Sequence, residues 1–501
     1  MGGAAVTPPA IDYRDLQGLV RFGYKHLHAA RYLLAQVRDR EAARAWLRQA
    51  PVTNAEYSLP PPEDALHVAL SAAGLDALGV PAGIRAGFSP EFLGGMTDGN
   101  RTRRLGDVGP NAPEHWQWGG PNGVPHVLVM VFATREGLAA AMDRCTGPAF
   151  NHAFDVQRTL ETSDLDGIEP FGFVDGISQP WVDWAQDASP SGRALDYSNI
   201  SALGEYVLGY ANEYAKFTDR PLVPADAASA ILPDALDAPG KKDVARNGTY
   251  LVFRQLGQDV RRFWQFVHGA SGGDAVAAEQ LASALVGRSR NGEPLVPVTA
   301  DTVEGTPPEV AAQNDFTFDG DPRGVACPFG SHVRRSNPRN TDYPGRPTGV
   351  RKLLAALGAS STGLRDDLIS AVRFHRILRR GREYGPGLEP ADALGRPASP
   401  EPERGLHFIA LNASIGRQFE FLQNAWLANT TFADLAGETD PLIGTREATP
   451  GCPATGTFSR PRHGGPAERV TGLPQFVTVR GGEYFFLPGL AALRYLAGGA
   501  S

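Results

Sequence analysis

The stretch Pro170-Phe171-Gly172-Phe173-Val174-Asp175-Gly176-Ile177-Ser178-Gln179-Pro180 sets a single carboxylate, Asp175, among apolar side chains. Gly172 and Gly176 let the backbone bend tightly and approach a flat or bulky partner. The apolar neighbours predict that Asp175 is partly shielded from water, and a shielded carboxylate is costly unless it is paired or has a chemical task. An Asp-Gly pair by itself more often marks a turn. Other segments of the chain are therefore needed to tell whether Asp175 is a turn residue or a reactive group.

The composition is that of a globular protein long enough for more than one domain. The 501 residues are 42% hydrophobic and 21% charged, which is typical of chains that bury a sizeable core. Lys and Arg number 48 against 55 Asp and Glu, so the net charge is −7. This balance lacks the basic excess of a nucleic-acid-binding protein.

The cysteines and the first residues bear on location. Cys145, Cys327 and Cys452 are far apart and form no CxxC pair, so a zinc or iron–sulfur site is not indicated and a reducing compartment is. The start, Met-Gly-Gly-Ala-Ala-Val, lacks the charged and apolar segments of a secretory signal. No run of 18 apolar residues predicts a transmembrane helix. We therefore predict a cytoplasmic protein with no membrane partner.

Strand and helix signals predict two α+β halves. Apolar runs and helix-forming segments predict strands at 15–24, 66–72 and 126–132 and helices at 29–49, 74–78 and 135–144. A similar order follows, with strands at 248–255 and 405–412, helices at 259–267 and 416–427, and a hairpin of 477–480 and 484–487 about Gly481-Gly482. Each half should be an antiparallel sheet with helices on one face. We assign 1–13 to a flexible tail, 14–200 to the N-terminal half with the Asp175 loop, and 201–501 to the C-terminal half.

Of the eleven histidines, His332 has the most informative neighbours. It lies in Ala326-Cys-Pro-Phe-Gly-Ser-His332-Val-Arg-Arg-Ser-Asn-Pro-Arg339, with three arginines in the next seven residues. An imidazole that ligates a metal, followed by guanidiniums that meet carboxylates, suits an anionic cofactor. An exposed basic loop is the alternative.

Two further segments combine charge with apolar residues. In Phe374-His-Arg-Ile-Leu-Arg379, an extended chain would put Arg379 on the same side as His375 and Ile377, whereas a helix would turn His375 toward the core. In Arg417-Gln-Phe-Glu420-Phe, Glu420 lies between two phenylalanines. Periodicity alone predicts an amphipathic helix there, with Glu420 on its wet face.

Together these segments resemble the dye-decolourising peroxidases, a family of haem peroxidases, over nearly the whole chain. Gly172-Phe-Val-Asp175-Gly176 matches the GxxDG motif of the family, and the His332 segment resembles its proximal-ligand segment. Ile377-Leu-Arg379-Arg-Gly381 resembles the distal-arginine segment. The segments Gly405–Phe408 and Arg417–Glu420 resemble its two C-terminal signatures. GxxDG alone is weak, but the set in this order is specific, and the length is similar to that of the larger bacterial subfamilies.

The resemblance implies two ferredoxin-like halves and one haem b per chain, between the Asp175 loop and the His332 segment. His332 would ligate the iron, and Glu420 would orient its other ring nitrogen. The resemblance also implies cofactor contacts from these residues: Arg334, Arg339, Gly172, Gly176, Leu406 and Phe408. Leu406 and Phe408 share one face of a strand and would form an apolar wall over the distal side.

The implied chemistry assigns roles to two further residues. Asp175 would move the peroxide proton, and Arg379 would stabilise charge on the departing oxygen. A long gap between His332 and Arg379 predicts an insertion at about 340–372, which leaves Arg380 as an alternative distal arginine.

The predicted function is therefore a haem peroxidase. It would reduce hydrogen peroxide and oxidise small or bulky aromatic donors, such as phenolics and dyes, through a ferryl intermediate, and it could form a homo-oligomer. Trp181, Trp184 and Trp264 are candidates for carrying electrons from bulky donors, although core packing explains each more simply. The alternatives are haem storage, delivery or iron removal from haem, and a cofactor-free binding protein of the same fold.

Overall fold

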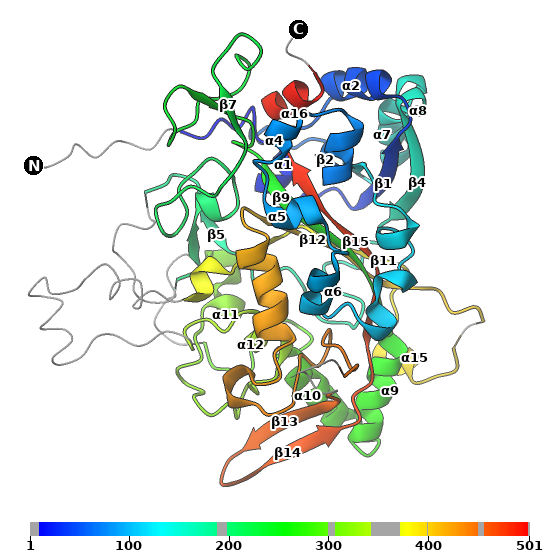
Figure 1. Ribbon diagram of the computed structural model, residues 1–501. Helices are drawn as coiled ribbons and strands as arrows, with labels where there is room; N and C mark the ends of the chain where they lie inside the picture. Colours follow the sequence, from blue (N-terminus) through cyan, green and yellow to red (C-terminus); the bar gives the residue numbers. More distant parts are fainter. Residues whose placement is uncertain are drawn as a thin grey trace, which may run out of the picture.

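A computed structural model describes residues 10–187, 198–298, 306–341, 371–397, 399–448 and 455–498. Its centre is a nine-stranded antiparallel sheet in the order β10-β12-β9-β15-β2-β3-β1-β4, with β11 also paired to β12 (Figure 1). The long strands β9 and β15 run through the middle of the molecule, with helices of both halves packed around them. The candidate site lies against the strands β9, β12 and β15 of this sheet.

The N-terminal half has the strand order of a ferredoxin-like fold, β2-β3-β1-β4. Its strands are β1 (Ala29–Val37), β2 (Asp64–Leu70), β3 (Val127–Ala133) and β4 (Phe154–Glu161). The helix α2 (Arg40–Gln49) connects β1 to β2, and α7 (Leu138–Cys145) and α8 (Pro148–Ala153) connect β3 to β4. All seven residues of β3 are buried, as expected for an inner strand covered on both faces.

The C-terminal half repeats this arrangement in the order β10-β12-β9-β15. Its strands are β9 (Thr249–Gln258), β10 (Leu378–Arg379), β11 (Arg382–Tyr384), β12 (Gly405–Asn412) and β15 (Val477–Leu487). The helices α9 (Val260–Ala270) and α10 (Ala275–Val286) follow β9, and two π-helical turns, η7 (Gly416–Glu420) and η8 (Leu422–Leu427), follow β12. The two halves join where Phe486 of β15 pairs with Leu70 of β2. The predicted α+β fold of two ferredoxin-like halves is thus confirmed. The division at residue 200 falls in the connection between β4 and β9 and stays a prediction.

Shorter elements decorate this frame. The helices are α1 (Gly18–Arg21), α3 (Ala72–Ala77), α4 (Ala82–Arg85), α5 (Pro90–Gly94), α6 (Gly99–Leu105), α11 (Ala311–Asn314), α12 (His332–Ser336), α15 (Pro390–Ala393) and α16 (Leu490–Leu496). The 3-10 turns are η1 (Gly109–Asn111), η2 (Pro113–His115), η3 (Gly120–Asn122), η4 (Leu203–Glu205), η5 (Pro308–Val310), η6 (Ala371–Phe374) and η9 (Phe432–Asp434). The strand pairs are β5 (Trp181–Asp183) with β6 (Ile200–Ala202), β7 (Leu222–Pro224) with β8 (Lys241–Asp243), and β13 (Thr457–Arg462) with β14 (Gly465–Thr471).

Three expectations about local structure are wrong. Residues 15–24 form no strand but the short helix α1, because the buried Gln17 side chain bonds the backbone of Val68 and Pro488 and ties this segment across the sheet. Residues 29–49 are not one helix: β1 ends before Asp39, whose carboxylate accepts the Ala42 N–H and caps α2. Since β1 lies between β3 and β4, its apolar run lacks the alternation of a half-exposed strand.

The third wrong expectation is the hairpin predicted about Gly481-Gly482. The strand β15 continues through both glycines, opposite Gln255 and Arg254 of β9. A Cβ at Gly481 would lie 2.5 Å from Trp118 Nε1, and one at Gly482 would lie 2.8 Å from Met96 Sδ. These glycines therefore mark close packing against the strand rather than a turn.

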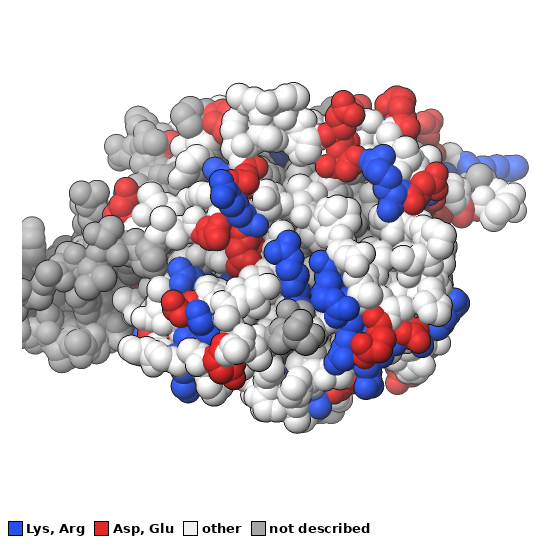
Figure 2. Space-filling view, turned by 90° about the horizontal axis from the view of Figure 1, so that it is seen from above, with Lys and Arg blue, Asp and Glu red and all other residues white. Residues whose placement is uncertain are grey.

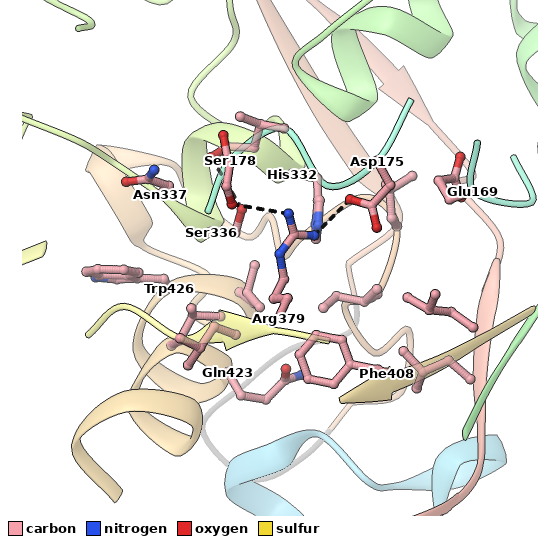
Figure 3. A pocket seen from close by; sticks show the side chains of 18 of the residues that line it. Glu169, Asp175, Ser178, His332, Ser336, Asn337, Arg379, Phe408, Gln423 and Trp426 are labelled. Carbon is pink, nitrogen blue, oxygen red and sulfur yellow. Dashed lines mark hydrogen bonds and ion pairs between the residues drawn. The ribbon is translucent and has the colours of Figure 1, made fainter. Parts of the chain in front are cut away.

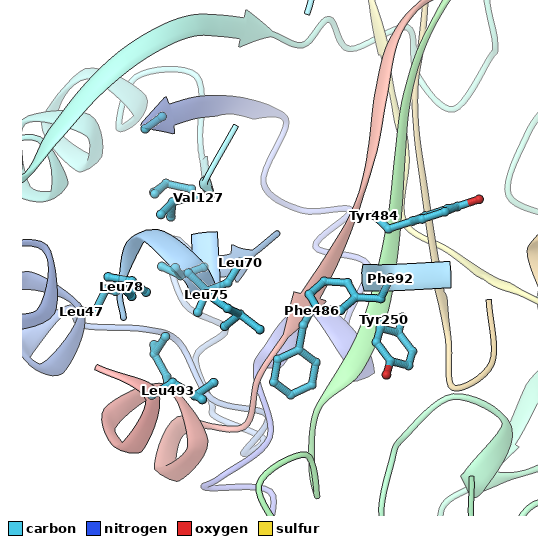
Figure 4. Packing of buried hydrophobic residues seen from close by; sticks show 14 of the residues in the cluster. Leu47, Leu70, Leu75, Leu78, Phe92, Val127, Tyr250, Tyr484, Phe486 and Leu493 are labelled. Carbon is cyan, nitrogen blue, oxygen red and sulfur yellow. The ribbon is translucent and has the colours of Figure 1, made fainter. Parts of the chain in front are cut away.

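Helices of both halves pack on the sheet through a large apolar cluster (Figure 4). Leu47 of α2, Leu75 of α3 and Leu493 of α16 meet Phe486 of β15 in it, and each is 0–2% exposed. Burying one such side chain contributes about 2 kcal/mol. This cluster holds the central strands on which the site depends.

On the face drawn in Figure 2, the described residues form no large patch of only positive or only negative charge. Figure 2 shows acidic and basic side chains close to one another across it. Among the described residues, no helix is both long and apolar enough to cross a lipid bilayer.

Candidate active site

A cavity of about 310 Å³ lies against the C-terminal half of the sheet (Figure 3). Three neighbouring strands present alternate residues to it, since side chains two apart share a face: Arg254, Leu256 and Gln258 from β9, Leu406 and Phe408 from β12, and Val477 and Val479 from β15. Other walls come from the Asp175 loop, α12, residues 372–379 and η8. The predicted apolar pair, Leu406 and Phe408, does line this cavity.

The Asp175 loop closes one side of the cavity. Gly172 and Gly176 have φ of 97° and 79°, values that favour glycine. A Cβ on Gly172 would face Arg290 at 3.3 Å. The two glycines thus shape the loop by their backbone conformation, and the cavity lining comes from the side chains between and beside them. Glu169 holds the loop from inside, where its carboxylate accepts the N–H groups of Phe171 and Phe173.

Asp175 and Arg379 form an ion pair inside the cavity. Arg379 Nη1 lies 2.9 Å from Asp175 Oδ1, and Arg379 Nη2 donates to the Ser178 carbonyl at 3.2 Å (Figure 3). The side chains expose 32% and 31% of their surface, respectively. Burial raises the pKa of Asp175, but the Arg379 guanidinium and the Gly176 N–H outweigh it and hold the pKa below its usual value. Asp175 is thus an ionised base at neutral pH.

The structure distinguishes Arg379 from its neighbour. The guanidinium of Arg380 donates to the carbonyls of Leu19 and Val20, away from the cavity. The segment is extended through β10, so Arg379, Ile377 and His375 all line the cavity. Of the two folds considered for this segment, the extended one is therefore observed.

His332 faces the cavity from the N-terminus of α12. Its Nδ1 lies 2.9 Å from Oδ2 of Asp440, whose side chain is fully buried. The other carboxylate oxygen of Asp440 accepts the N–H groups of Leu442 and Ile443. Burial lowers the pKa of His332, but the Asp440 carboxylate outweighs it and raises the pKa above its usual value. An Nδ1–H donated to Asp440 leaves Nε2 with a lone pair for the cavity, the arrangement that supports a metal-ligating histidine.

Glu420 does not orient His332, and that prediction is wrong. Its Oε1 accepts a hydrogen bond from the Tyr484 hydroxyl at 2.9 Å and forms an ion pair with Arg101, whose Nε lies 2.5 Å away. Glu420 is 3% exposed and lies in the π-helical turn η7, from which its carboxylate contacts Arg101 of α6 and Tyr484 of β15. Asp440 fills the role instead. Its segment, Thr439-Asp440-Pro441, has only the signal of an Asp-Pro turn, and sequence reasoning missed it.

Arg334 and Arg339 do not line the cavity, contrary to expectation. Arg334 bonds Asp321 Oδ2 at 2.9 Å and the Cys327 carbonyl at 2.6 Å. Arg339 bonds the Phe316 carbonyl at 2.7 Å and stacks on the Phe316 ring at 3.6 Å. Each of these arginines exposes 2% or less of its surface. Their bonds tie α12 and the residues after it to the segment 314–327.

Other groups of the cavity fit a haem. Arg288 and Arg376, which sequence reasoning did not single out, also line it; Arg288 donates to the Gly292 carbonyl and the Ser178 hydroxyl, and Arg376 donates to the Ile200 carbonyl and the Ser201 hydroxyl. Asn337 Oδ1 is buried in the lining without a hydrogen-bond partner among the described residues. Apolar side chains from α12 and from the segment after Asp440 also line the cavity: Val333, Leu442 and Ile443. A carboxylate-backed histidine in a cavity with largely apolar walls fits a haem.

The three tryptophans considered as electron carriers differ in exposure. Trp264 is 4% exposed and donates its Nε1–H to the Phe171 carbonyl, so it packs in the core. Trp184 packs against Tyr13 at 6.1 Å. Trp181 is 49% exposed. A surface electron-transfer role for any of them stays a prediction. The insertion expected at 340–372 lies largely outside the described residues.

Curated proteins of similar sequence are dye-decolourising peroxidases. The chain is 33% identical to the multifunctional dye peroxidase of an Amycolatopsis species over 67% of its own length and 62% of that protein. It is 30% identical to a dye-decolourising peroxidase of Mycetinis scorodonius over 86% of its length and 76% of that protein. A relative from Auricularia auricula-judae is 26% identical over 98% of this chain and 88% of that protein. No protein-family model matches the chain.

Solved structures show the same fold. An ancestral D-type dye-decolourising peroxidase superposes with a TM-score of 0.72 at 24% identity, covering 97% of this chain and 99% of that chain. The Auricularia auricula-judae enzyme gives a TM-score of 0.70 at 23% identity, with coverage of 97% and 100%. A dye-decolourising peroxidase in complex with 2,6-dimethoxyphenol gives 0.68 at 23%, again over 97% and 100%.

Proposed function

The chain belongs to the dye-decolourising peroxidases, haem-dependent oxidoreductases that act on peroxide, and from this premise we propose that it binds one haem b through His332, reduces hydrogen peroxide and oxidises small aromatic donors. One observation carries the proposal. A single cavity holds a carboxylate-backed histidine, His332 with Asp440, together with a carboxylate–guanidinium pair, Asp175 with Arg379.

The histidine side of the cavity would hold the cofactor. When bound, haem would supply an iron with one open coordination position at which peroxide can be cleaved. His332 would hold the iron through Nε2, and Asp440 would fix the tautomer and make the imidazole a stronger donor.

The other side would move the proton of peroxide. Asp175 is ionised at neutral pH and is the only carboxylate in the described lining that pairs with Arg379. It would take a proton from the near oxygen of peroxide and return it to the departing one. Arg379 stays charged at any ordinary pH and would stabilise the negative charge that develops there. Leu406 and Phe408 would exclude water from this side.

The donors proposed for this chain follow those of its relatives. A structural neighbour is described in complex with 2,6-dimethoxyphenol, and the largely apolar walls of the cavity suit an aromatic ring. We infer a cytoplasmic location from the sparse cysteines, of which Cys145 and Cys327 are free and buried. Cell fractionation tests that location, and sedimentation of the purified protein tests for a homo-oligomer.

The decisive experiment separates binding from turnover. A pyridine haemochrome assay on the purified protein measures the kind and amount of haem, with one haem b per chain expected. Stopped-flow mixing of the ferric protein with peroxide should change the Soret band within milliseconds, and a phenolic donor should restore it. A protein that stores, delivers or dismantles haem would bind the cofactor but react slowly with peroxide, and that result would overturn the peroxidase assignment.

A further inference from the structure

A second histidine, His375, lines the cavity and has no part in the mechanism above. It lies four residues before Arg379 on the same extended segment, with Ile377 between them, and all three side chains reach the lining. Figure 3 places Trp426, its ring neighbour, at the opposite end of the cavity from Glu169. Because the His375 ring meets Trp426, it belongs to the end of the cavity opposite Glu169.

Three contacts fix the orientation of the His375 ring. It stacks on Phe421, with centroids 3.5 Å apart and planes at 8°, and meets the edge of Trp426 at 5.4 Å. Its Nδ1 lies 2.5 Å from the Arg417 carbonyl. A carbonyl can only accept, so Nδ1 carries the proton and Nε2 carries a lone pair.

The second ring nitrogen is left for a ligand. Among the described residues no group bonds Nε2, and it is absent from the buried atoms that lack a partner. The ring is partly exposed, and it lines the cavity. Burial lowers the pKa of His375 to about 4, so the ring is neutral in ordinary buffers and its lone pair is available.

A comparison with other histidines argues against a purely structural role. His67 is fully buried with both ring nitrogens unpaired, but it packs among Tyr24 and Phe132 and reaches no described cavity. His407 points to the other face of β12 and bonds the Glu161 carbonyl. His375 differs from both because its ring is held by packing while its free acceptor stays accessible.

The surroundings of this acceptor are apolar. Four lining side chains belong to one small apolar cluster with Phe421, on which the His375 ring stacks: Val372, Ile377, Leu422 and Trp426. We call this end of the cavity the His375 lobe. A ligand that suits it has an apolar ring and one hydroxyl group. The hydroxyl can donate a hydrogen bond to His375 Nε2, whereas a second acceptor on the ligand would find no donor in the apolar wall. A phenol has this chemistry.

We propose that this lobe binds a small phenolic donor and that His375 Nε2 accepts its hydroxyl hydrogen bond and then its proton. The proposal rests on the proposed function, since peroxide must first supply the oxidising equivalent. In the step, the phenolic O–H bond breaks, the proton goes to His375 Nε2 and one electron goes to the oxidised protein, leaving a phenoxyl radical. The imidazolium returns its proton to water before the next donor binds. A weak base suffices because a phenol that has lost an electron is a strong acid.

Two substitutions separate hydrogen-bond acceptance by His375 from proton uptake. His375→Phe keeps a ring on Phe421 but removes the acceptor. His375→Gln keeps an acceptor and a donor for the Arg417 carbonyl but cannot take up the proton. Binding of phenol to the ferric holoprotein, followed by calorimetry, should weaken roughly fivefold to tenfold in His375→Phe, the loss of one hydrogen bond. It should change little in His375→Gln.

Turnover should separate the two functions of the ring. Phenol oxidation should slow about 100-fold in both variants, with a changed solvent isotope effect. Oxidation of ferrocyanide, which has no proton to lose, should keep its rate, and so should the reaction with peroxide. The exposed His463→Phe is the matched control and should behave as wild type. Anisole, the methyl ether of phenol, should bind all variants equally.

The outcomes are distinguishable from failure of the proposed function. A wild-type holoprotein that does not react with peroxide would refute the peroxidase, not the lobe. Variants with native haem content and thermal unfolding that bind and oxidise phenol like wild type would refute the role of His375. A change in the ferric absorption spectrum of the variants would make His375 an iron ligand and would also overturn the proposal.

Discussion

The two halves of the sheet share one strand order but differ in what covers it. In the N-terminal half, all seven residues of β3 are buried among apolar side chains of both faces. In β12, the equivalent strand of the C-terminal half, Leu406 and Phe408 remain partly exposed and line the cavity. The difference lies in the segments around the sheet rather than in the sheet itself. The Asp175 loop, α12 and residues 372–377 border a cavity beside β12, whereas apolar side chains of α2 and α3 pack into the core at the N-terminal strands.

The largest expected effect compares a histidine from each half. His332→Ala should lose most of the haem because it removes the only ligand that Asp440 supports, while the apoprotein remains folded. His67→Phe, in the packed core of the other half, should retain full haem content. The pyridine haemochrome assay and the Soret absorbance measure both. A His332→Ala protein with a full Soret band and normal turnover would reassign the ligand.

Asp175→Asn tests the loop that crosses from the N-terminal half to the cavity. The amide cannot take a proton, so the reaction with peroxide should slow by about 10²–10⁴-fold while the haem is kept. Asp166→Asn, an exposed change at the start of the same loop, is the matched control. Stopped-flow traces that are equal for Asp175→Asn and wild type would remove Asp175 from the mechanism.

Arg379→Leu should act both on rate and on pH dependence. Loss of the cation should cost about 10²–10³-fold in peroxide cleavage. Because the guanidinium holds the pKa of Asp175 below its usual value, its removal should raise that pKa. Asp175 must be ionised to act as a base, so the acid limb of the pH–rate profile should move to higher pH. Arg380→Leu, which loses bonds to Leu19 and Val20, should lower thermal stability and leave the limb in place.

The pair Asp440→Asn and Glu420→Gln tests which carboxylate supports the ligand. Asp440→Asn should weaken haem affinity by about 10–100-fold, the usual cost of losing such a partner. Glu420→Gln should leave affinity unchanged and lower the unfolding temperature, because Arg101 and Tyr484 lose their buried partner. Haem transfer to apomyoglobin measures affinity. The reverse result would restore the original assignment of Glu420.

This pair also shows where sequence reasoning reached its limit. The local apolar pattern predicted a strand at 405–412, which are the bounds of β12. The resemblance to the family identified the segments that carry Asp175, His332 and Arg379. Asp440 lies 108 residues after His332, and only the tertiary fold brings it there. Glu420 was assigned because its segment resembles a signature of the family, but in the fold its carboxylate contacts Tyr484 of β15 and Arg101. Arg334 and Arg339 carry the right charge at the right spacing, and burial under α12 turns them toward the protein.

The smallest effect concerns stability and returns to the two equivalent strands. Leu128 of β3 is fully buried in close packing, so Leu128→Ala should leave a void and cost about 2–5 kcal/mol of unfolding free energy. Phe408 of β12 borders a cavity already present, so Phe408→Ala should cost less, although phenylalanine is the larger side chain. Urea unfolding of the apoprotein compares the two variants. A larger loss in Phe408→Ala would mean that the C-terminal half packs as tightly as the N-terminal half, and the cavity would then need haem to hold it open.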